Sequence, residues 1–183
     1  RVPDSIIVVF DEAYFEYVEA VDYPNILDYH ARHPAILTLR TFSKLYGLAG
    51  LRIGYGIGAK SVIALMQRVR QPFNVNAPAQ WAALAALDDT EHVQRSLGVN
   101  QQGVKYLQTE FARLGLSYIP SQANFILVRV GNGPEVFQRL LQQGVIVRPM
   151  VGYKFPEHVR MTVGTMAENQ KLIGALERII QAS

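Results

Sequence analysis

The sequence predicts an α/β fold, in which part of a mainly parallel sheet flanked by helices is followed by a small α+β domain. Residues 6–10 (Ile-Ile-Val-Val-Phe) are a continuous apolar run, typical of a strand that is buried on both faces. A second apolar run, residues 35–39, follows a short helical stretch at about residues 25–31, so the two strands should be parallel with a right-handed crossover. After Gly115, short strands alternate with helices, as in a small α+β unit.

The rest of the first domain follows from local patterns. Residues 51–57 predict another strand, whose glycines allow close approach of the backbone. Helices are expected at about residues 59–71 and 78–87. A longer helix is expected at about residues 90–114, where apolar residues recur at helical spacing and Thr90 is the expected N-cap.

The second domain begins, in this interpretation, with the long helix, so that the domains are residues 1–89 and 90–183. The apolar runs after Gly115 predict four strands, at residues 117–119, 124–130, 145–147 and 159–163. The amphipathic stretches predict helices at about residues 134–143 and 167–180.

Composition narrows the classes of protein. The net charge is only +3 and the basic residues are scattered, so no nucleic acid partner is expected. No apolar stretch approaches the ~20 residues of a membrane span, and no membrane partner is expected. The absence of cysteine agrees with a cytoplasmic protein. The histidines lack metal-ligand spacing; we expect no metal and interpret them as surface residues (His30, His33, His92 and His158).

The beginning of the sequence is unusual for a complete domain. There is neither an initiating Met nor a signal peptide, and Arg1 is followed almost at once by a core-like strand. We therefore expect the chain to be a segment of a longer protein.

Two polar residues follow the two parallel strands. Asp11 comes directly after the first, and Lys44 lies in the loop after the second, so both should face one crevice at the carboxyl edge of the sheet. An amine whose pKa is lowered by desolvation or a nearby cation can condense with an aldehyde cofactor. Asp11 can keep a pyridinium nitrogen protonated. The alternatives are a surface lysine in a loop and an aspartate that caps a turn.

Further residues nearby suit an aromatic phosphate ligand. Arg52 lies between apolar neighbours, which is costly unless its guanidinium meets an anion. With the hydroxyls of Thr41 and Ser43 it forms a plausible phosphate cradle. Tyr14 can direct its hydroxyl towards a ring oxygen of the ligand, although core packing is the alternative.

The segments Asp11-Glu12-Ala13-Tyr14 and Thr41 to Arg52 closely resemble the fold type I (class I/II) pyridoxal-phosphate-dependent aminotransferases. The resemblance implies that Lys44 carries pyridoxal 5'-phosphate as a Schiff base and that Arg52 binds its phosphate. Asp11 would bind the pyridine nitrogen, and Tyr14 the ring oxygen. Together with the hydroxyl residues, the implied cofactor-binding set is Asp11, Tyr14, Thr41, Ser43, Lys44 and Arg52. The family usually has Ser where this chain has Thr41, which keeps the hydroxyl.

Four later stretches are similar to histidinol-phosphate aminotransferases, namely residues 72–76, 121–128, 144–148 and 159–165. This similarity implies that Arg160 binds the anionic group of the substrate and that Arg148 assists when that group is a phosphate. It also implies that Asn124 lies close to the substrate. Without it, the two arginines are solvated or salt-bridged strand-edge residues, and Asn124 can equally bond the backbone.

The resemblance implies a cytoplasmic, homodimeric enzyme of histidine biosynthesis. It would move an amino group between histidinol phosphate, or a similar donor, and 2-oxoglutarate by a ping-pong route, with Lys44 as the general base. Two alternatives stay open: a pyridoxal-phosphate-dependent decarboxylase of a phosphorylated amino acid on the same scaffold, and a non-catalytic fragment. Family members are about twice as long, so the chain is expected to be their C-terminal part, holding half of the cofactor site.

Overall fold

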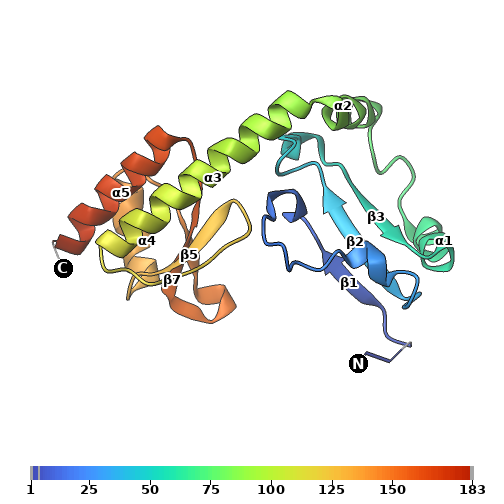
Figure 1. Cartoon of the computed structure of the whole chain (residues 1–183), viewed down its shortest axis with the longest axis horizontal. Coiled ribbons are helices and arrows are strands. Elements are labelled where there is room, and N and C mark those ends of the chain that lie inside the picture. Colours follow the sequence, from blue (N-terminus) through green and yellow to red (C-terminus); the bar gives the residue numbers. More distant parts are fainter. Residues whose placement is uncertain (1, 4, 182–183) are drawn as a thin grey trace. The chain divides into compact units, whose positions relative to one another are not determined.

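A computed structural model of the chain describes residues 2–3 and 5–181. The chain divides into two compact units, Arg1–Gln94 and Arg95–Ser183. Helix α3 (Thr90–Arg113) begins in the first unit and continues in the second (Figure 1).

The first unit contains a three-stranded sheet in the order β1 (Val8–Asp11), β2 (Ile36–Thr41) and β3 (Gly54–Gly58). Strands β1 and β2 are parallel, as the sequence predicts. Strand β3 runs antiparallel to β2, so the sheet is mixed and the mainly parallel prediction is correct for one pair only. Residues 42–53 join β2 to β3 without a crossover α-helix, and a connection of this kind suits antiparallel neighbours.

Strand β1 is less buried than its apolar run predicts. Ile7 is 59% exposed and Val9 53% exposed, whereas Val8 and Phe10 are half-buried. The strand is at the edge of its sheet, and its residues alternate between a partly covered face and an open one. The prediction of burial on both faces is therefore wrong for the described residues.

Two helical elements of the first unit, η2 (Ile26–Tyr29) and α2 (Ala77–Asp88), begin at an asparagine side-chain cap. The expected helix at 25–31 is only the 3₁₀ turn η2, capped by Asn25. The Asn76 side chain caps α2 by accepting a 2.8 Å hydrogen bond from the amide of Ala79. The remaining elements of this unit are η1 (Phe15–Tyr17), η3 (Ala49–Leu51) and α1 (Lys60–Val69).

The N-cap of α3 differs from the prediction. Thr90 is already helical, and Asp89 Oδ1 accepts a 2.9 Å hydrogen bond from the amide of His92. The Asp89 carbonyl also accepts from the amide of Val93. Asp89 is therefore the cap, because its carboxylate accepts from a free amide of the first turn.

The second unit has an antiparallel sheet in the order β4 (Tyr118–Ile119), β5 (Phe125–Arg129), β7 (Phe155–Thr162) and β6 (Arg148–Met150). The strand expected at 145–147 is wrong, because β6 begins only at Arg148, while Val145 and Val147 contribute to the core just before it. The remaining elements of this unit are α4 (Gly133–Gln142), η4 (Val151–Tyr153) and α5 (Met166–Gln181).

One face of this second sheet is the core of the unit. Alternate residues of β5 and β7 are fully buried in a cluster to which α3, α4 and α5 contribute (Ile126, Val128, Val159, Met161, Leu107, Leu140 and Leu176). Arg160 lies between two of these strand residues and is only half-buried. Because side chains alternate along a strand, Arg160 is on the face opposite the core. No helix among the described residues is long and apolar enough to cross a membrane.

Candidate active site

Lys44 lies in a tight loop directly after β2. Phe42 and Leu45 are only 5% and 3% exposed and anchor the loop, whereas Lys44 itself is exposed. The amide of Gly47 donates a 3.0 Å hydrogen bond to the carbonyl of Lys44. Gly47 has φ +70°, a left-handed conformation that favours glycine. The loop therefore presents the amine of Lys44 outward from a rigid base.

Tyr14 and Lys44 are brought together from different segments. The Lys44 Nζ atom is 5.2 Å from the centroid of the Tyr14 ring. Asp11 ends β1, at the same carboxyl edge of the parallel pair where the loop of Lys44 begins. Its Oδ1 atom accepts a 3.2 Å hydrogen bond from the amide of Ala13, so the turn-capping alternative is seen in the structure. Its other carboxylate oxygen can still accept a hydrogen bond from a ligand.

The hydroxyl of Thr41 organises the start of the loop. Thr41 Oγ1 accepts a 3.0 Å hydrogen bond from the amide of Ser43. Across the sheet, Thr41 is opposite Gly54. A Cβ atom at Gly54 would lie only 2.7 Å from the carbonyl oxygen of Arg40, so the close approach predicted for glycines of this strand is confirmed here.

Arg52 lies just before β3, rather than inside the strand predicted at 51–57, and its backbone is left-handed, with φ 56° and ψ 59°. It is exposed, and its Nη1 atom donates a 2.8 Å hydrogen bond to the carbonyl of Ala49. A non-glycine residue in this region stores roughly 1–3 kcal/mol of strain, and such residues gather at functional sites. The bond to Ala49 uses one of the five N–H groups of the guanidinium and leaves others for a ligand.

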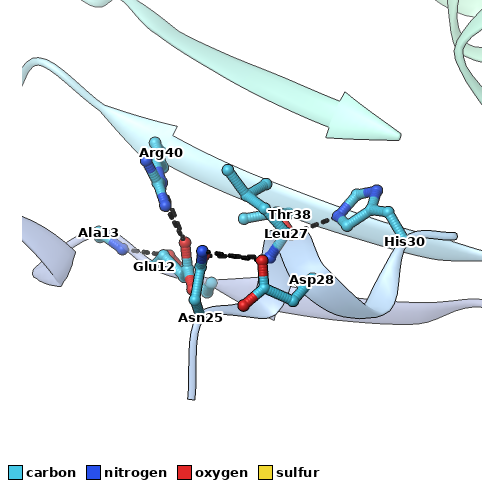
Figure 2. A network of polar contacts seen from close by, with 9 residues as sticks. Glu12, Ala13, Asn25, Leu27, Asp28, His30, Thr38 and Arg40 are labelled. Carbon is cyan, nitrogen blue, oxygen red and sulfur yellow. Dashed lines mark hydrogen bonds and ion pairs between the residues drawn. The ribbon is translucent and has the colours of Figure 1, made fainter. Parts of the chain in front are cut away.

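Sequence reasoning did not single out Glu12 and Arg40. Arg40 Nε donates a 2.9 Å hydrogen bond to Glu12 Oε2, and the two side chains are only 13% and 2% exposed (Figure 2). The signal available was their position, since Glu12 follows Asp11 and Arg40 precedes Thr41. A charged residue at the end of an apolar strand has no local periodicity that would reveal its partner.

The surface interpretation is wrong for the histidines, because all four are half-buried. His92 Nε2 is 2.9 Å from the carbonyl oxygen of Leu45, in the loop of Lys44. His30 Nε2 is 3.0 Å from the hydroxyl of the fully buried Thr38 (Figure 2). Both rings are half-buried because they bond polar groups of neighbouring segments. His33 and His158 are half-buried as well.

In the second unit, Arg148 and Arg160 are direct cross-strand partners of β6 and β7. Arg160 packs its guanidinium 4.8 Å from the ring centroid of Phe125, and Arg148 packs 5.8 Å from that of Tyr153. Within the described residues, Arg160 Nε is buried without a hydrogen-bond partner. Two guanidiniums on one face of a sheet form a site that suits an anion.

Asn124 lies just before β5, at the end of the pairing with β7. Its carbonyl accepts a 2.8 Å hydrogen bond from the amide of Val163. This bond involves the backbone of Asn124, so it leaves the role of the amide side chain open.

Nearly the whole chain is similar to known proteins. Residues 2–176 match the family model of the class I and II aminotransferases. The chain is 53% identical over 180 residues to histidinol-phosphate aminotransferase 1 of Nitrosococcus oceani, covering 98% of this chain and 49% of the relative. It is 49% identical to histidinol-phosphate aminotransferase 2 of Pseudomonas fluorescens, with the same coverage. The chain thus spans about half the length of the curated relatives it matches.

Among solved structures, the chain is similar to histidinol-phosphate aminotransferase from Sinorhizobium meliloti in complex with pyridoxal-5'-phosphate. The TM-score is 0.88 at 27% identity, and the match covers 99% of this chain and 50% of that one. The similarity therefore extends over both units.

Proposed function

Because the chain belongs to the class I and II aminotransferases, we propose that it is the C-terminal part of a pyridoxal-phosphate-dependent histidinol-phosphate aminotransferase. The enzyme would transfer an amino group from histidinol phosphate to 2-oxoglutarate. The observation that carries this proposal is the exposed amine of Lys44, held by a rigid loop at the carboxyl edge of a parallel strand pair. Ligands bind at this edge in open α/β sheets.

The residues at this edge suit pyridoxal phosphate in their chemistry. The cofactor, when bound, supplies an aldehyde that condenses with a primary amine and a ring that accepts an electron pair. The carboxylate of Asp11 would keep the ring nitrogen protonated, and the hydroxyl of Tyr14 would bond the ring oxygen. The strained Arg52 would bind the cofactor phosphate. The hydroxyls of Thr41 and Ser43 would complete the cradle.

Lys44 would have a second task once the donor has replaced it on the cofactor. Its free Nζ atom would take the proton from the substrate Cα and return it to the C4′ carbon of the cofactor. The exposure of the side chain supports this proposal, because an amine that moves a proton must reach both positions. The contact with the Tyr14 ring limits the directions in which the amine can turn.

The arginine pair of the second sheet supports a phosphorylated donor. Like charges directly opposite each other on a sheet are destabilising unless an anion lies between them. A phosphate dianion offers more oxygens and more charge to two guanidiniums than a carboxylate does. We therefore assign the acidic group of the donor to Arg160, with Arg148 assisting and Asn124 close to the substrate.

The test is an assay of the full-length enzyme with 2-oxoglutarate as acceptor and with histidinol phosphate, phenylalanine or threonine phosphate as donor. We expect glutamate to form fastest with histidinol phosphate. Lys44→Ala should lower this rate roughly 10²–10⁴-fold, the range of general acid–base catalysis. Release of carbon dioxide from threonine phosphate without glutamate formation would favour the decarboxylase instead.

The assembly and location of the whole enzyme are part of the same proposal. We propose a cytoplasmic homodimer. Trp81, Leu84 and Leu87 of α2 are exposed in the chain, and a helix that is apolar on all sides is typical of buried positions. Light scattering of the purified full-length protein should give twice the mass of one chain; the mass of a single chain would contradict the dimer. If the polypeptide isolated from its natural source has a mass of only 20.5 kDa, this would support a non-catalytic fragment.

A further inference from the structure

Glu12 and Arg40 join the ends of the two parallel strands. Arg40 Nε and Nη2 both lie 2.9 Å from Glu12 Oε2 (Figure 2). Glu12 is the residue after Asp11, and Arg40 is the residue before Thr41. We propose that this ion pair is a positioning device that sets the geometry between Asp11 and the loop of Lys44, an inference that rests on the proposed function.

The pair is a poor device for stability alone. A buried ion pair is often no more stabilising than apolar residues of similar size, because both charges lose their hydration. Within the described residues, Glu12 Oε1 is buried and has no hydrogen-bond partner, which adds a further cost. Such an ion pair fixes the orientation of two segments relative to each other, which apolar side chains do not do.

The contacts around the pair reach three of the segments that carry proposed cofactor residues. The amide of Glu12 donates a 2.9 Å hydrogen bond to the carbonyl of Leu39, which continues the pairing of β1 and β2. The Arg40 guanidinium lies 3.8 Å from the ring centroid of Phe15, the residue next to Tyr14. Through these contacts, Arg40 connects the end of β1 and the turn of Tyr14 to the strand that leads to Lys44.

Arg40 stays charged under all working conditions. Burial lowers the pKa of its guanidinium, but hydrogen bonds to Glu12 and Tyr55 outweigh this effect and raise it above its ordinary value. Tyr55 is the cross-strand partner of Arg40 on β3. The ion pair is therefore linked to all three strands of the sheet.

The experiment uses the full-length enzyme with Glu12→Gln, Arg40→Lys and Glu157→Gln. Glu12→Gln keeps the shape and removes the charge. Arg40→Lys keeps the charge but replaces the planar fork that holds Glu12. Glu157→Gln is the matched control, because it breaks an exposed ion pair with Arg129 whose N–O distance is 3.0 Å, in the other unit.

Three properties are measured for each variant: the midpoint of thermal unfolding, the affinity of the apoenzyme for pyridoxal phosphate, and the pH midpoint of the visible absorption of the bound cofactor. We expect Glu12→Gln to lower the affinity roughly tenfold, as for the loss of a hydrogen bond to a charged group, and to shift the pH midpoint. Arg40→Lys should change both in the same direction, and Glu157→Gln should change neither.

The outcomes separate the inference from the proposed function. Reduced thermal stability with unchanged affinity and pH midpoint would show that the pair is merely structural, which overturns the inference. If Glu12→Gln does not fold, Arg40→Lys decides by the same two measurements. A wild-type enzyme that shows no visible absorption with pyridoxal phosphate would instead overturn the proposed function itself.

Discussion

Arg148 lies directly opposite Arg160 on the neighbouring antiparallel strands β6 and β7. Both side chains are thus on one face of the sheet, whose other face is the apolar core. Arg129 on β5 differs, because its guanidinium bonds both carboxylate oxygens of Glu157. In the pair of Arg148 and Arg160, by contrast, Arg160 Nε has no hydrogen-bond partner within the described residues. This difference is the basis for distinguishing an anion site from a structural arginine.

Replacing Arg148 should affect phosphorylated donors most. We expect Arg148→Ala to lower the ratio of kcat/KM for histidinol phosphate to that for phenylalanine by roughly 10-fold or more, since a hydrogen bond to a charged group is worth about 1.5–3 kcal/mol. Arg160→Ala should lower kcat/KM for both donors. Arg129→Ala is the control and should leave the ratio unchanged. An unchanged ratio in Arg148→Ala would mean that this arginine is structural.

Replacing Arg52 should weaken cofactor binding. The affinity of the full-length apoenzyme for pyridoxal phosphate should fall by roughly 1.5–3 kcal/mol in Arg52→Ala. Arg52→Gly should bind as weakly, yet unfold at a higher temperature than Arg52→Ala, because glycine adopts the left-handed backbone at φ 56° without strain. Equal affinities of Arg52→Ala and wild type would show that the guanidinium does not contact the phosphate.

The raised pKa of Glu16 predicts that the stability of the protein depends on pH. Burial raises the pKa of its carboxyl group, and nearby Glu12 adds to this, while a backbone hydrogen bond and the charge of Arg40 oppose it. Because the folded pKa lies above the unfolded value of 4.5, ionisation of Glu16 destabilises the fold as pH rises through the interval between the two. The thermal midpoint of Glu16→Gln should therefore increase relative to that of wild type as the pH rises above 4.5.

The control for this prediction is Glu19→Gln, which replaces an exposed carboxylate of the same segment. Its difference from wild type should change less with pH. A Glu16→Gln difference that does not depend on pH would contradict the assigned environment of the Glu16 carboxyl group.

The stability of the protein should depend on Thr165, which precedes the first residue of α5. Its hydroxyl donates a 2.8 Å hydrogen bond to Glu168 Oε2, whose carboxylate also accepts from the Thr165 amide at 2.7 Å. This is a capping box. Thr165→Ala should cost about 0.5–2 kcal/mol of stability, whereas Thr165→Ser should cost less. Thermal unfolding of the full-length enzyme measures both, and equal losses would show that the hydroxyl is not the cap.

The same cap has a pH dependence of opposite sign. Hydrogen bonds from the Thr165 hydroxyl and amide lower the pKa of Glu168. Its contribution to stability is therefore present above the unfolded pKa of 4.5 and is lost as pH falls through the lower folded value. The stability difference between wild type and Glu168→Gln should shrink in this acidic window.

Sequence patterns predicted the features that follow from the order of strands and helices along the chain. The parallel pairing of β1 and β2 is confirmed. The roles of Asp11, Lys44 and Arg52 in binding a cofactor stay predictions.

What the sequence did not reveal depends on contacts between distant segments. The antiparallel return of β3 follows from a loop whose path has no periodic signal. The bond of His92 to the loop of Lys44 and the pair of Glu12 with Arg40 each join residues far apart in the chain. A polar residue that becomes buried by such a contact looks like a surface residue in the sequence.

The most direct test of the account is the identity of the lysine that carries the cofactor. Full-length enzyme is incubated with pyridoxal phosphate, reduced with borohydride and digested, and the labelled peptide is identified by mass spectrometry. The account predicts that the label is on the peptide containing Lys44. Recovery of the label on Lys60 or Lys105 instead, with Lys44 unmodified, would contradict it.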